Sequence, residues 1–404
     1  MSHVEVMNGN RAAGIAACLA RPDVIAAYPI TPQSSVVEFI SRMIAEGKLD
    51  AKICEVESEH SAMSVLEGAS LAGARTFSAT SSQGLALMYE PYFRASTLRL
   101  PIVMAIANRE MISPQTLWAS AQDSLSVRDA GWMQFYAEDN QEILDTLLQA
   151  FRIAEDSRVL LPINVCYDGF YLSHMSERVV VPDAEEVDAF LPDGYDPEHI
   201  VLDPDRPMAV DPLTNGDLLT EYRAKHLAAQ QAALQVIEEV DAAFSNAFGR
   251  SWDGAVEPYR IDEGCQAIVV TLGSMTGAGR EAVDRLRDDG EAVGLLKIRA
   301  VRPFPAREVR EQLAGVPAVG VVDRNVSFGW NTGIIYQEVS SALYGVQGTA
   351  RIPIISGLGG EDITVEMFED ALRKILVAGR LSSERRDETP ETIWLRQEKE
   401  GGAA

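Results

Sequence analysis

Short, continuously apolar stretches alternate with stretches of helical periodicity along the first 175 residues. Strands without polar alternation are typical of parallel sheets that helices cover on both faces. The apolar stretches predict strands at 23–28, 51–55, 100–107 and 160–166. Helices are predicted between them, at 8–20, 35–45, 61–72, 85–95 and 140–155. This β/α alternation predicts an open α/β domain.

A second alternation of the same kind begins near Cys265. It predicts strands at 267–272, 292–298, 318–323 and 351–355, separated by helices, the last of which ends near Val377. The fold class that follows is α/β, with two doubly wound domains joined by a long connection and a helix. The expected boundaries are 1–175, 176–260 for the connecting arm, 261–380, and 381–404 for a charged, loosely held tail.

The connecting arm has a different pattern from both domains. Residues 176–215 are rich in Pro and Asp and show little periodicity, which predicts a long connection over the surface. Residues 218–248 predict one amphipathic helix. Its apolar stripe contains Leu227, Leu234, Ile237 and Val240. The arm is either a spacer or an element that packs on a neighbouring subunit.

Composition narrows the class of protein. The chain has 404 residues, 47% of them hydrophobic, and 60 Asp+Glu against 35 Lys+Arg. This acidic balance argues against binding to nucleic acid or to anionic membranes. No apolar run approaches the roughly 20 residues that span a bilayer, and residues 1–10 lack the features of a signal peptide. We therefore expect a cytoplasmic protein.

Cysteine and histidine show no metal-binding pattern. The four cysteines lie far apart without a C-x-x-C, which excludes a local iron–sulfur or zinc motif and suits a reducing compartment. They are Cys18, Cys54, Cys166 and Cys265. The five histidines also lack ligand spacing, so we predict no metal site in this chain.

Candidate chemistry begins with the acidic residues at a strand-to-helix junction, Glu55, Glu57 and Glu59. The next predicted strand ends in Ser-Ser-Gln-Gly, and open α/β sheets hold ligands beyond such carboxyl ends. A partly desolvated Glu59 would be suited to proton transfer. The alternative is an acidic residue that only stabilises the first turn of a helix.

Two further polar residues lie at predicted strand ends. Thr31 projects from a Pro-Ile-Thr-Pro turn, and Arg109 follows the strand at 100–107. The alternatives are structural. Thr31 could only stabilise the turn, and Arg109 could form a structural ion pair with Glu110 or a nearby Asp. In the second domain, residues 273–279 form G-x-x-x-G-x-G, which is a weak phosphate motif and favours a tight strand-to-helix turn.

An ordered set of motifs resembles one family over about residues 5–378. The chain contains YPITPQSS (28–35), ESEHSA (57–62), TSSQGL (80–85), NREM (108–111) and VRDAGW (127–132). The second half adds VIEEVDAAFSNAFGR (236–250), VTLGSMTG (270–277), RPFP (302–305), VDRNVSFG (322–329) and GLGGEDIT (357–364). Together they resemble the α subunit of thiamine-diphosphate-dependent 2-oxoacid:acceptor oxidoreductases, such as pyruvate:ferredoxin oxidoreductase. The resemblance implies a pyrimidine-binding domain followed by a transketolase C-terminal-like domain.

The resemblance also implies roles for individual residues. Glu59 would hydrogen-bond N1′ of the cofactor's aminopyrimidine and favour the tautomer that deprotonates C2. Thr31 would hydrogen-bond the substrate, and Arg109 would bind its carboxylate. Ser82 and Gln83 would line the aminopyrimidine pocket.

Partner subunits follow from what the sequence lacks. The diphosphate and its Mg²⁺ need a Gly-Asp-Gly turn in this cofactor class, and none occurs here. A β subunit would supply that half of the site, and iron–sulfur clusters on other subunits (γ/δ-type and cluster-rich) would accept electrons. Coenzyme A would accept the acyl group, and a ferredoxin or an NAD-reducing subunit would take the electrons from the clusters. We expect a hetero-oligomer that is inactive without these partners.

The resemblance leaves several 2-oxoacids as candidate substrates. In the pyruvate enzymes an Ala-Leu-type pair and a His-containing stretch follow the arginine, whereas here the run is EMISPQTLWASAQD (110–123). This departure slightly favours phenylglyoxylate over pyruvate, with oxalate as a further option. Residues that could line a wider pocket, or pack in the core instead, are Met111, Ile112, Leu117 and Trp118. Rival hypotheses are a non-catalytic α/β scaffold and a self-sufficient thiamine or nucleotide-binding protein.

Overall fold

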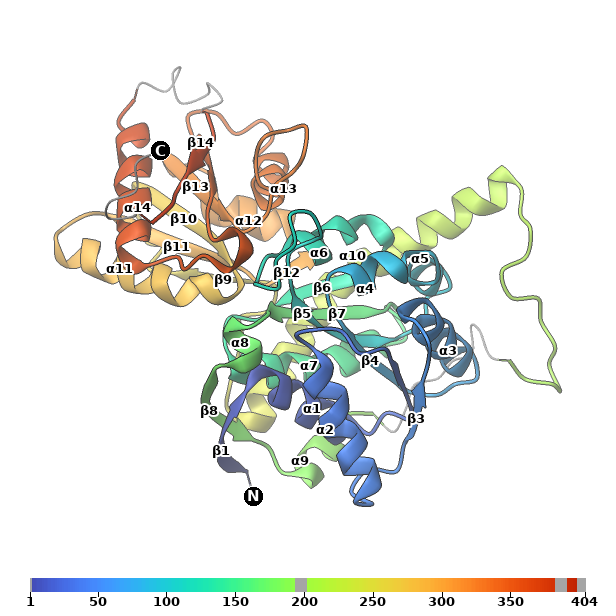
Figure 1. Ribbon diagram of the computed structural model, residues 1–404. Coiled ribbons are helices and arrows are strands. Elements are labelled where there is room, and N and C mark those ends of the chain that lie inside the picture. Colours follow the sequence, from blue (N-terminus) through green and yellow to red (C-terminus); the bar gives the residue numbers. More distant parts are fainter. Residues whose placement is uncertain (1, 193–201, 382–390, 398–404) are drawn as a thin grey trace.

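The computed structural model describes residues 2–192, 202–381 and 391–397, and it contains two open sheets (Figure 1). The first sheet has seven strands in the order β12-β6-β7-β5-β4-β2-β3. Six of them run parallel, and β12 pairs antiparallel with β6. The strands are β2 (Val24–Ala27), β3 (Lys52–Glu55), β4 (Thr76–Thr80), β5 (Val103–Asn108), β6 (Met133–Tyr136), β7 (Ile163–Asp168) and β12 (Ala300–Arg302).

Helices cover both faces of this sheet because alternate strand residues enter two different cores. Val103 and Ala105 of β5 belong to one core, and Met104 and Ile106 belong to the other. The first core is covered by α1 (Gly9–Ala20), α2 (Ser34–Ala45) and α7 (Asn140–Ala154). The second is covered by α3 (Glu59–Leu71), α4 (Gln83–Leu87), α5 (Tyr89–Thr97), α6 (Gln122–Ser126) and the 3₁₀ turn η1 (Arg128–Ala130).

The second sheet has six strands in the order β15-β14-β13-β10-β11-β9, and only β9 is antiparallel to its neighbour. They are β9 (Val256–Tyr259), β10 (Ala267–Leu272), β11 (Val293–Ile298), β13 (Ala318–Asp323), β14 (Ala350–Ile355) and β15 (Ile393–Trp394). One face carries α11 (Thr276–Asp288) and α14 (Val365–Gly379); the other carries α12 (Ala306–Leu313) and α13 (Ile334–Ala342). The prediction of two doubly wound α/β domains is therefore confirmed.

The region expected to be an irregular connection contains regular structure at its start. Strand β8 (Ser176–Val181) pairs with β1 (His3–Asn8) in a separate two-stranded sheet, between α8 (Tyr171–His174) and α9 (Ala184–Phe190). The prediction for 176–215 is wrong over these residues, because Val179 and Val181 alternate inward within a polar sequence. Residues 193–201 of that prediction lie outside the described residues, as does most of the expected tail, although its residues 393–394 form β15.

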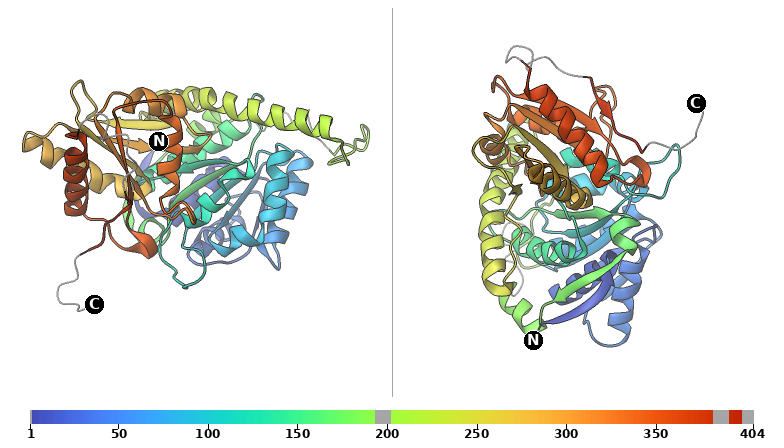
Figure 2. Two further views of the ribbon diagram at one scale, coloured as in Figure 1. Left: turned by 90° about the horizontal axis from the view of Figure 1, so that it is seen from above. Right: turned by 90° about the vertical axis from the view of Figure 1, so that its left-hand side faces the viewer.

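The long helix α10 (Gly216–Phe248) is confirmed, and it is buried against the body of the protein from His226 onward, while its N-terminal end is exposed. Ile237 and Val240 are buried against the first domain. Leu227 is 66% exposed, so its predicted place on the buried stripe is wrong. Leu227 lies on the outer face of the helix, next to the buried His226 and Ala229, and the N-terminal end of α10 projects beyond the domain (Figure 1 and the left view of Figure 2).

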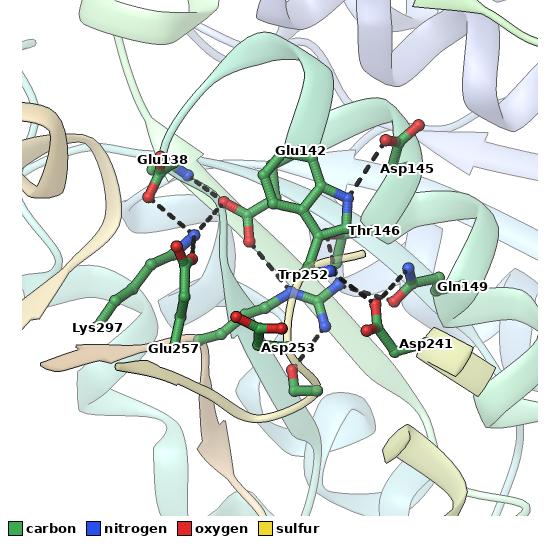
Figure 3. Close-up of polar contacts among 12 residues, drawn as sticks. Glu138, Glu142, Asp145, Thr146, Gln149, Asp241, Trp252, Asp253, Glu257 and Lys297 are labelled. Atoms are coloured by element: carbon green, nitrogen blue, oxygen red, sulfur yellow. Dashed lines mark hydrogen bonds and ion pairs between the residues drawn. The ribbon is translucent and has the colours of Figure 1, made fainter. Parts of the chain in front are cut away.

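A buried ionic cluster joins the two domains (Figure 3). Lys297 of β11 is fully buried, and its Nζ lies 2.8 Å from Glu142 of α7, 2.9 Å from Glu138 and 3.3 Å from Glu257. Arg299 donates to Glu142 (3.1 Å), and Arg280 pairs with Glu138 and Glu257. Three cations thus face three carboxylates, so the buried charges are balanced.

The described residues contain no helix with the length and apolarity needed to cross a membrane.

Candidate functional site

Four loops that follow neighbouring parallel strands form a row along one edge of the first sheet. Strands β3, β2, β4 and β5 are adjacent in that order. The chain leaves them toward Glu59, Thr31, Ser82 and Arg109, respectively. Because carboxyl ends of parallel strands meet at one edge, residues up to 78 positions apart converge there.

Glu59 is the first residue of α3, and it is buried. Ser58 caps the helix by accepting a hydrogen bond from the N–H of Ser61, so the cap does not need Glu59. Glu59 is 5% exposed, and burial raises the pKa of its carboxyl group. Its own backbone N–H opposes this rise in pKa, and among the described residues no cation pairs with the carboxylate. A buried acid without a cationic partner is therefore available to a ligand.

Neighbouring polar atoms share this lack of a partner. Thr80 Oγ1 and Gln83 Oε1 are buried without a hydrogen-bond partner in the described structure. Both flank Gly84, where a Cβ would approach Glu59 Oε1 to 2.9 Å and Thr80 Oγ1 to 2.2 Å. Glycine at this position therefore lets the turn after β4 lie against the acid.

These groups fit an aminopyrimidine ring. Such a ring presents nitrogen donors and acceptors along one edge, and a carboxyl group, a hydroxyl and an amide oxygen can satisfy them. The cost of burying Glu59, Thr80 and Gln83 unpaired would then be recovered when the ring binds.

Ser82 is held by backbone contacts at the start of α4. Its φ is 46°, a left-handed conformation that few residues other than glycine adopt. Its hydroxyl donates to the carbonyl of Glu110 (2.7 Å), and its N–H donates to Asp123 Oδ2 (2.9 Å). The Ser82 side chain therefore links the turn after β4 to the loop after β5.

Arg109 and Thr31 are in contact, through the backbone of Thr31. The Nη1 of Arg109 donates to the Thr31 carbonyl (2.9 Å), and Nε donates to the Thr116 carbonyl (3.4 Å). Both of these contacts are to backbone carbonyls, and within the described residues Arg109 forms no ion pair with Glu110 or with another acid, so the structural ion pair considered from sequence is absent there. Burial lowers the pKa of Arg109, and Asp123 opposes that effect. Thr31 itself is exposed beside the guanidinium.

Asp123 was not anticipated as a site residue, although it lies at the centre of these contacts. It is 1% exposed, and its two oxygens accept hydrogen bonds from four donors. These are the N–H groups of Ser82, Arg109 and Ser124 and the side-chain amide of Asn108. Nothing in the run ASAQDS distinguishes this residue by motif, so only the fold reveals it.

The loop that departs from the pyruvate-enzyme pattern forms a rim beside Arg109. Ile112, Leu117 and Trp118 are exposed, Trp118 by 54%, and Met111 is half-buried. The alternative that these residues pack in the core is therefore wrong for the exposed three. Trp118 contacts the Phe170 ring (centroids 4.6 Å apart), and the Ala119 carbonyl accepts from Gly360 of the second domain (2.8 Å).

The glycine-rich segment of the second domain is a turn, as favoured from sequence. Strand β10 passes directly into η2 (Gly273–Met275) and α11, and Gly273 has a φ of 67°. Ser274 donates to Asp168 of the first domain, which also accepts from Arg324 Nη1 (2.7 Å). No group of three or more candidate metal ligands occurs among the described residues.

Comparison with known proteins identifies the class. Residues 15–242 match the family model "Pyruvate flavodoxin/ferredoxin oxidoreductase, thiamine diP-bdg", and residues 265–368 match "Pyruvate:ferredoxin oxidoreductase core domain II". The fold and site therefore define a thiamine-diphosphate-dependent α/β oxidoreductase. The chain belongs to the 2-oxoacid:acceptor oxidoreductase family and corresponds to its α subunit, a component of multi-subunit complexes.

Curated relatives cover nearly the whole chain. It is 48% identical over 369 residues to the α subunit of NADH-dependent phenylglyoxylate dehydrogenase from Aromatoleum evansii (90% of this chain, 88% of that one). It is 44% identical over 396 residues to pyruvate synthase subunit PorA from Methanocaldococcus jannaschii (98% of each). It is 43% identical over 385 residues to ketoisovalerate oxidoreductase subunit VorA from Pyrococcus horikoshii (94% of this chain, 96% of that one).

Solved structures support the fold. The 2-oxoglutarate:ferredoxin oxidoreductase from Magnetococcus marinus superposes with a TM-score of 0.73 at 20% identity, over 92% of this chain and 65% of that one. A split-gene transketolase superposes with a TM-score of 0.54 at 14% identity, over 93% of this chain and all of that one.

Proposed function

We propose that this α subunit works in a complex that oxidatively decarboxylates a 2-oxoacid with coenzyme A, and that phenylglyoxylate is favoured over pyruvate. The observation that carries the preference is the exposed rim of Ile112, Leu117 and Trp118 next to Arg109. An aromatic ring needs apolar surface beside the group that binds its carboxylate. The 48% identity to a phenylglyoxylate dehydrogenase subunit is consistent with this preference, although pyruvate-synthase relatives are nearly as similar.

In this proposal Glu59 is the proton-transfer group. The raised pKa of its carboxyl group brings proton exchange closer to neutral pH, and the side chain lies against Gly84 in the turn after β4. Bound thiamine diphosphate supplies the nucleophilic carbon and the electron sink for loss of CO₂. Glu59 hydrogen-bonds the cofactor's aminopyrimidine, while Ser82 and Gln83 shape the wall around it.

Arg109 and Thr31 bind the substrate. Arg109 Nη2 makes no hydrogen bond within the described structure, so the guanidinium can bind a carboxylate while Nη1 stays on the Thr31 carbonyl. Thr31 is an exposed residue of the same turn, and its hydroxyl would contact the substrate there. This arrangement fixes the orientation of the 2-oxoacid relative to Glu59.

Other subunits complete the reaction. We infer that a β subunit holds the diphosphate and its Mg²⁺, since no Gly-Asp-Gly occurs in the sequence. Iron–sulfur subunits would carry the electrons to ferredoxin or to an NAD-reducing subunit, and coenzyme A would accept the acyl group.

Besides phenylglyoxylate and pyruvate, oxalate is the third candidate substrate.

Substrate preference is tested with the purified complex. We expect a higher kcat/KM for phenylglyoxylate than for pyruvate, measured as CO₂ release and acyl-CoA formation under anaerobic conditions. Leu117→Ala should reduce kcat/KM for phenylglyoxylate more than for pyruvate, by about five- to tenfold, because apolar contact with the ring is lost. Equal or higher kcat/KM for pyruvate would contradict the preference, and no CO₂ from any 2-oxoacid would contradict the proposed reaction.

Replacing Arg109 tests the carboxylate site. Arg109→Lys keeps the positive charge but loses the planar pair of donors, so the KM for the 2-oxoacid should rise about 10- to 100-fold. Steady-state kinetics with coenzyme A saturating would measure this. Arg94→Lys, at a partly exposed arginine of α5 that pairs with Glu67 and Asp211, is the matched control and should leave KM unchanged. An unchanged KM in Arg109→Lys would remove Arg109 from the substrate site.

A further inference from the structure

The loops that carry Ser82 and Arg109 meet at one buried carboxylate. Asp123 Oδ2 accepts from both backbone N–H groups, at 2.9 Å from Ser82 and 3.0 Å from Arg109. Its other oxygen, Oδ1, accepts from Asn108 Nδ2 (2.7 Å) and from the N–H of Ser124 (2.8 Å). All four donors that contact Asp123 are uncharged, so its direct contacts stabilise the negative charge through oriented dipoles.

The left-handed backbone at Ser82 needs such an anchor. A residue with a side chain at a φ of 46° is strained, and surrounding contacts must hold it there. The hydrogen bond from its N–H to Asp123 provides one contact, and the bond from its hydroxyl to Glu110 provides another. Gly84, two residues later, can then lie against Glu59.

The direction of Arg109 depends on the same carboxylate. The N–H of Arg109 donates to Asp123, and the carbonyl of Glu110, the next residue, accepts from the Ser82 hydroxyl. Asn108, which precedes it, is fully buried and donates to both Asp123 and Ser124 Oγ (2.7 Å). Burial raises the pKa of Asp123 to about 6, and the hydrogen bonds from Arg109, Ser82, Asn108 and Ser124 act to lower it.

We propose that Asp123 is a positioning residue, which fixes the loop of Arg109 and the turn of Ser82 relative to each other and so aligns the substrate carboxylate site with the cofactor pocket. This inference rests on the proposed function of the site and adds a residue that itself touches neither substrate nor cofactor. It acts through the two backbone N–H groups that share Oδ2.

The test is Asp123→Asn in the intact complex. The asparagine has the same shape, but its NH₂ group must face two of the four donors, so either the N–H groups of Ser82 and Arg109 or the Asn108 amide and the Ser124 N–H lose their acceptor. We expect the KM for the 2-oxoacid to rise at least about fivefold, with the KM for coenzyme A unchanged. A KM for the 2-oxoacid within twofold of wild type, in an assembled complex, would overturn the proposal.

The double variant Asn108→Asp with Asp123→Asn provides a rescue. The asparagine at 123 can then donate to the new carboxylate at 108 with its oxygen on the Ser82 and Arg109 N–H groups, so that of the four donors only the Ser124 N–H lacks its acceptor. We expect the KM for the 2-oxoacid to recover by at least half of its logarithmic increase. Absence of recovery in a folded double variant would count against the shared acceptor.

Asp241→Asn is the matched control. Asp241 is also a buried carboxylate with uncharged donors, from Gln149, Ser251 and the N–H of Trp252, and it lies on α10 in the cluster of Figure 3. Its replacement should lower thermal stability without changing the KM for the 2-oxoacid. If Asp123→Asn behaves like Asp241→Asn, the role of Asp123 is only structural and the proposal is wrong.

Failure of Asp123→Asn to assemble and failure of the proposed function give different results. If Asp123→Asn does not assemble, Asn108→Ala removes one donor while leaving the carboxylate, and a KM increase of about two- to fivefold is then required. Failure of the proposed function would instead appear in the wild-type complex, as absence of turnover with any 2-oxoacid.

Discussion

Glu59→Gln should lower kcat for the 2-oxoacid by about 10²- to 10⁴-fold, the usual contribution of a positioned proton-transfer group. Glutamine preserves the size of the side chain and can still hydrogen-bond a ring nitrogen, but it cannot exchange a proton. Because Glu59 is buried beside Gly84, water is poorly placed to replace it. The measurement is single-turnover and steady-state CO₂ release by the purified complex.

The control for this variant is Glu57→Gln. Glu57 lies two residues away, is exposed and accepts a hydrogen bond from Ser61 Oγ (2.6 Å). Its replacement should leave kcat within about twofold of wild type, as for most surface substitutions. A Glu59→Gln complex that retains more than a third of wild-type kcat would instead favour the scaffold hypothesis, in which this chain only organises its partners.

Lys297→Met should destabilise the chain by about 3–5 kcal/mol, because it leaves buried carboxylates with one cation fewer. Burial acts to lower the pKa of Lys297, but Glu142, Glu138 and Glu257 outweigh it and raise the pKa to about 12. The folded-state pKa thus exceeds the ordinary 10.5, so this contribution is complete below that pH and is lost as pH rises through about 12.

Urea unfolding at neutral pH, followed by circular dichroism, would measure the change in stability. Lys374→Met is a suitable comparison, since Lys374 forms an exposed pair with Asp370 on α14 (2.7 Å) and should contribute less than about 1 kcal/mol. Equal effects of the two replacements would show that burial of the ionic cluster does not strengthen its contribution.

The sequence predicted the parts of the fold whose pattern is local. Strands such as β5 are continuously apolar, and the helix α1 coincides with the helix expected at 8–20. By contrast, β6 and β12 were not predicted, since Met133–Tyr136 and Ala300–Arg302 are too short to show a period. β12 becomes a strand by pairing with β6 across 165 or more residues, and β6 also pairs with β7 about 30 residues further along the chain; no local pattern encodes either pairing.

The candidate site was predictable to a similar extent. Glu59, Thr31, Ser82 and Arg109 follow strands and match motifs, and the structure brings their loops to one edge of the sheet. Gln83 lies in the same turn. Asp123 could not be inferred in this way, because its importance comes from four donors that meet only after the sheet has formed.

Strand β12 has a consequence for how the chain can be divided. It belongs to the second half of the sequence, yet it completes the first sheet by pairing with β6. A cut in the connecting arm would therefore leave the N-terminal fragment with an uncovered sheet edge, a known route to aggregation. The two halves are thus interdependent in folding, and gene fission or shuffling between them would have to carry residues 300–302 across the join.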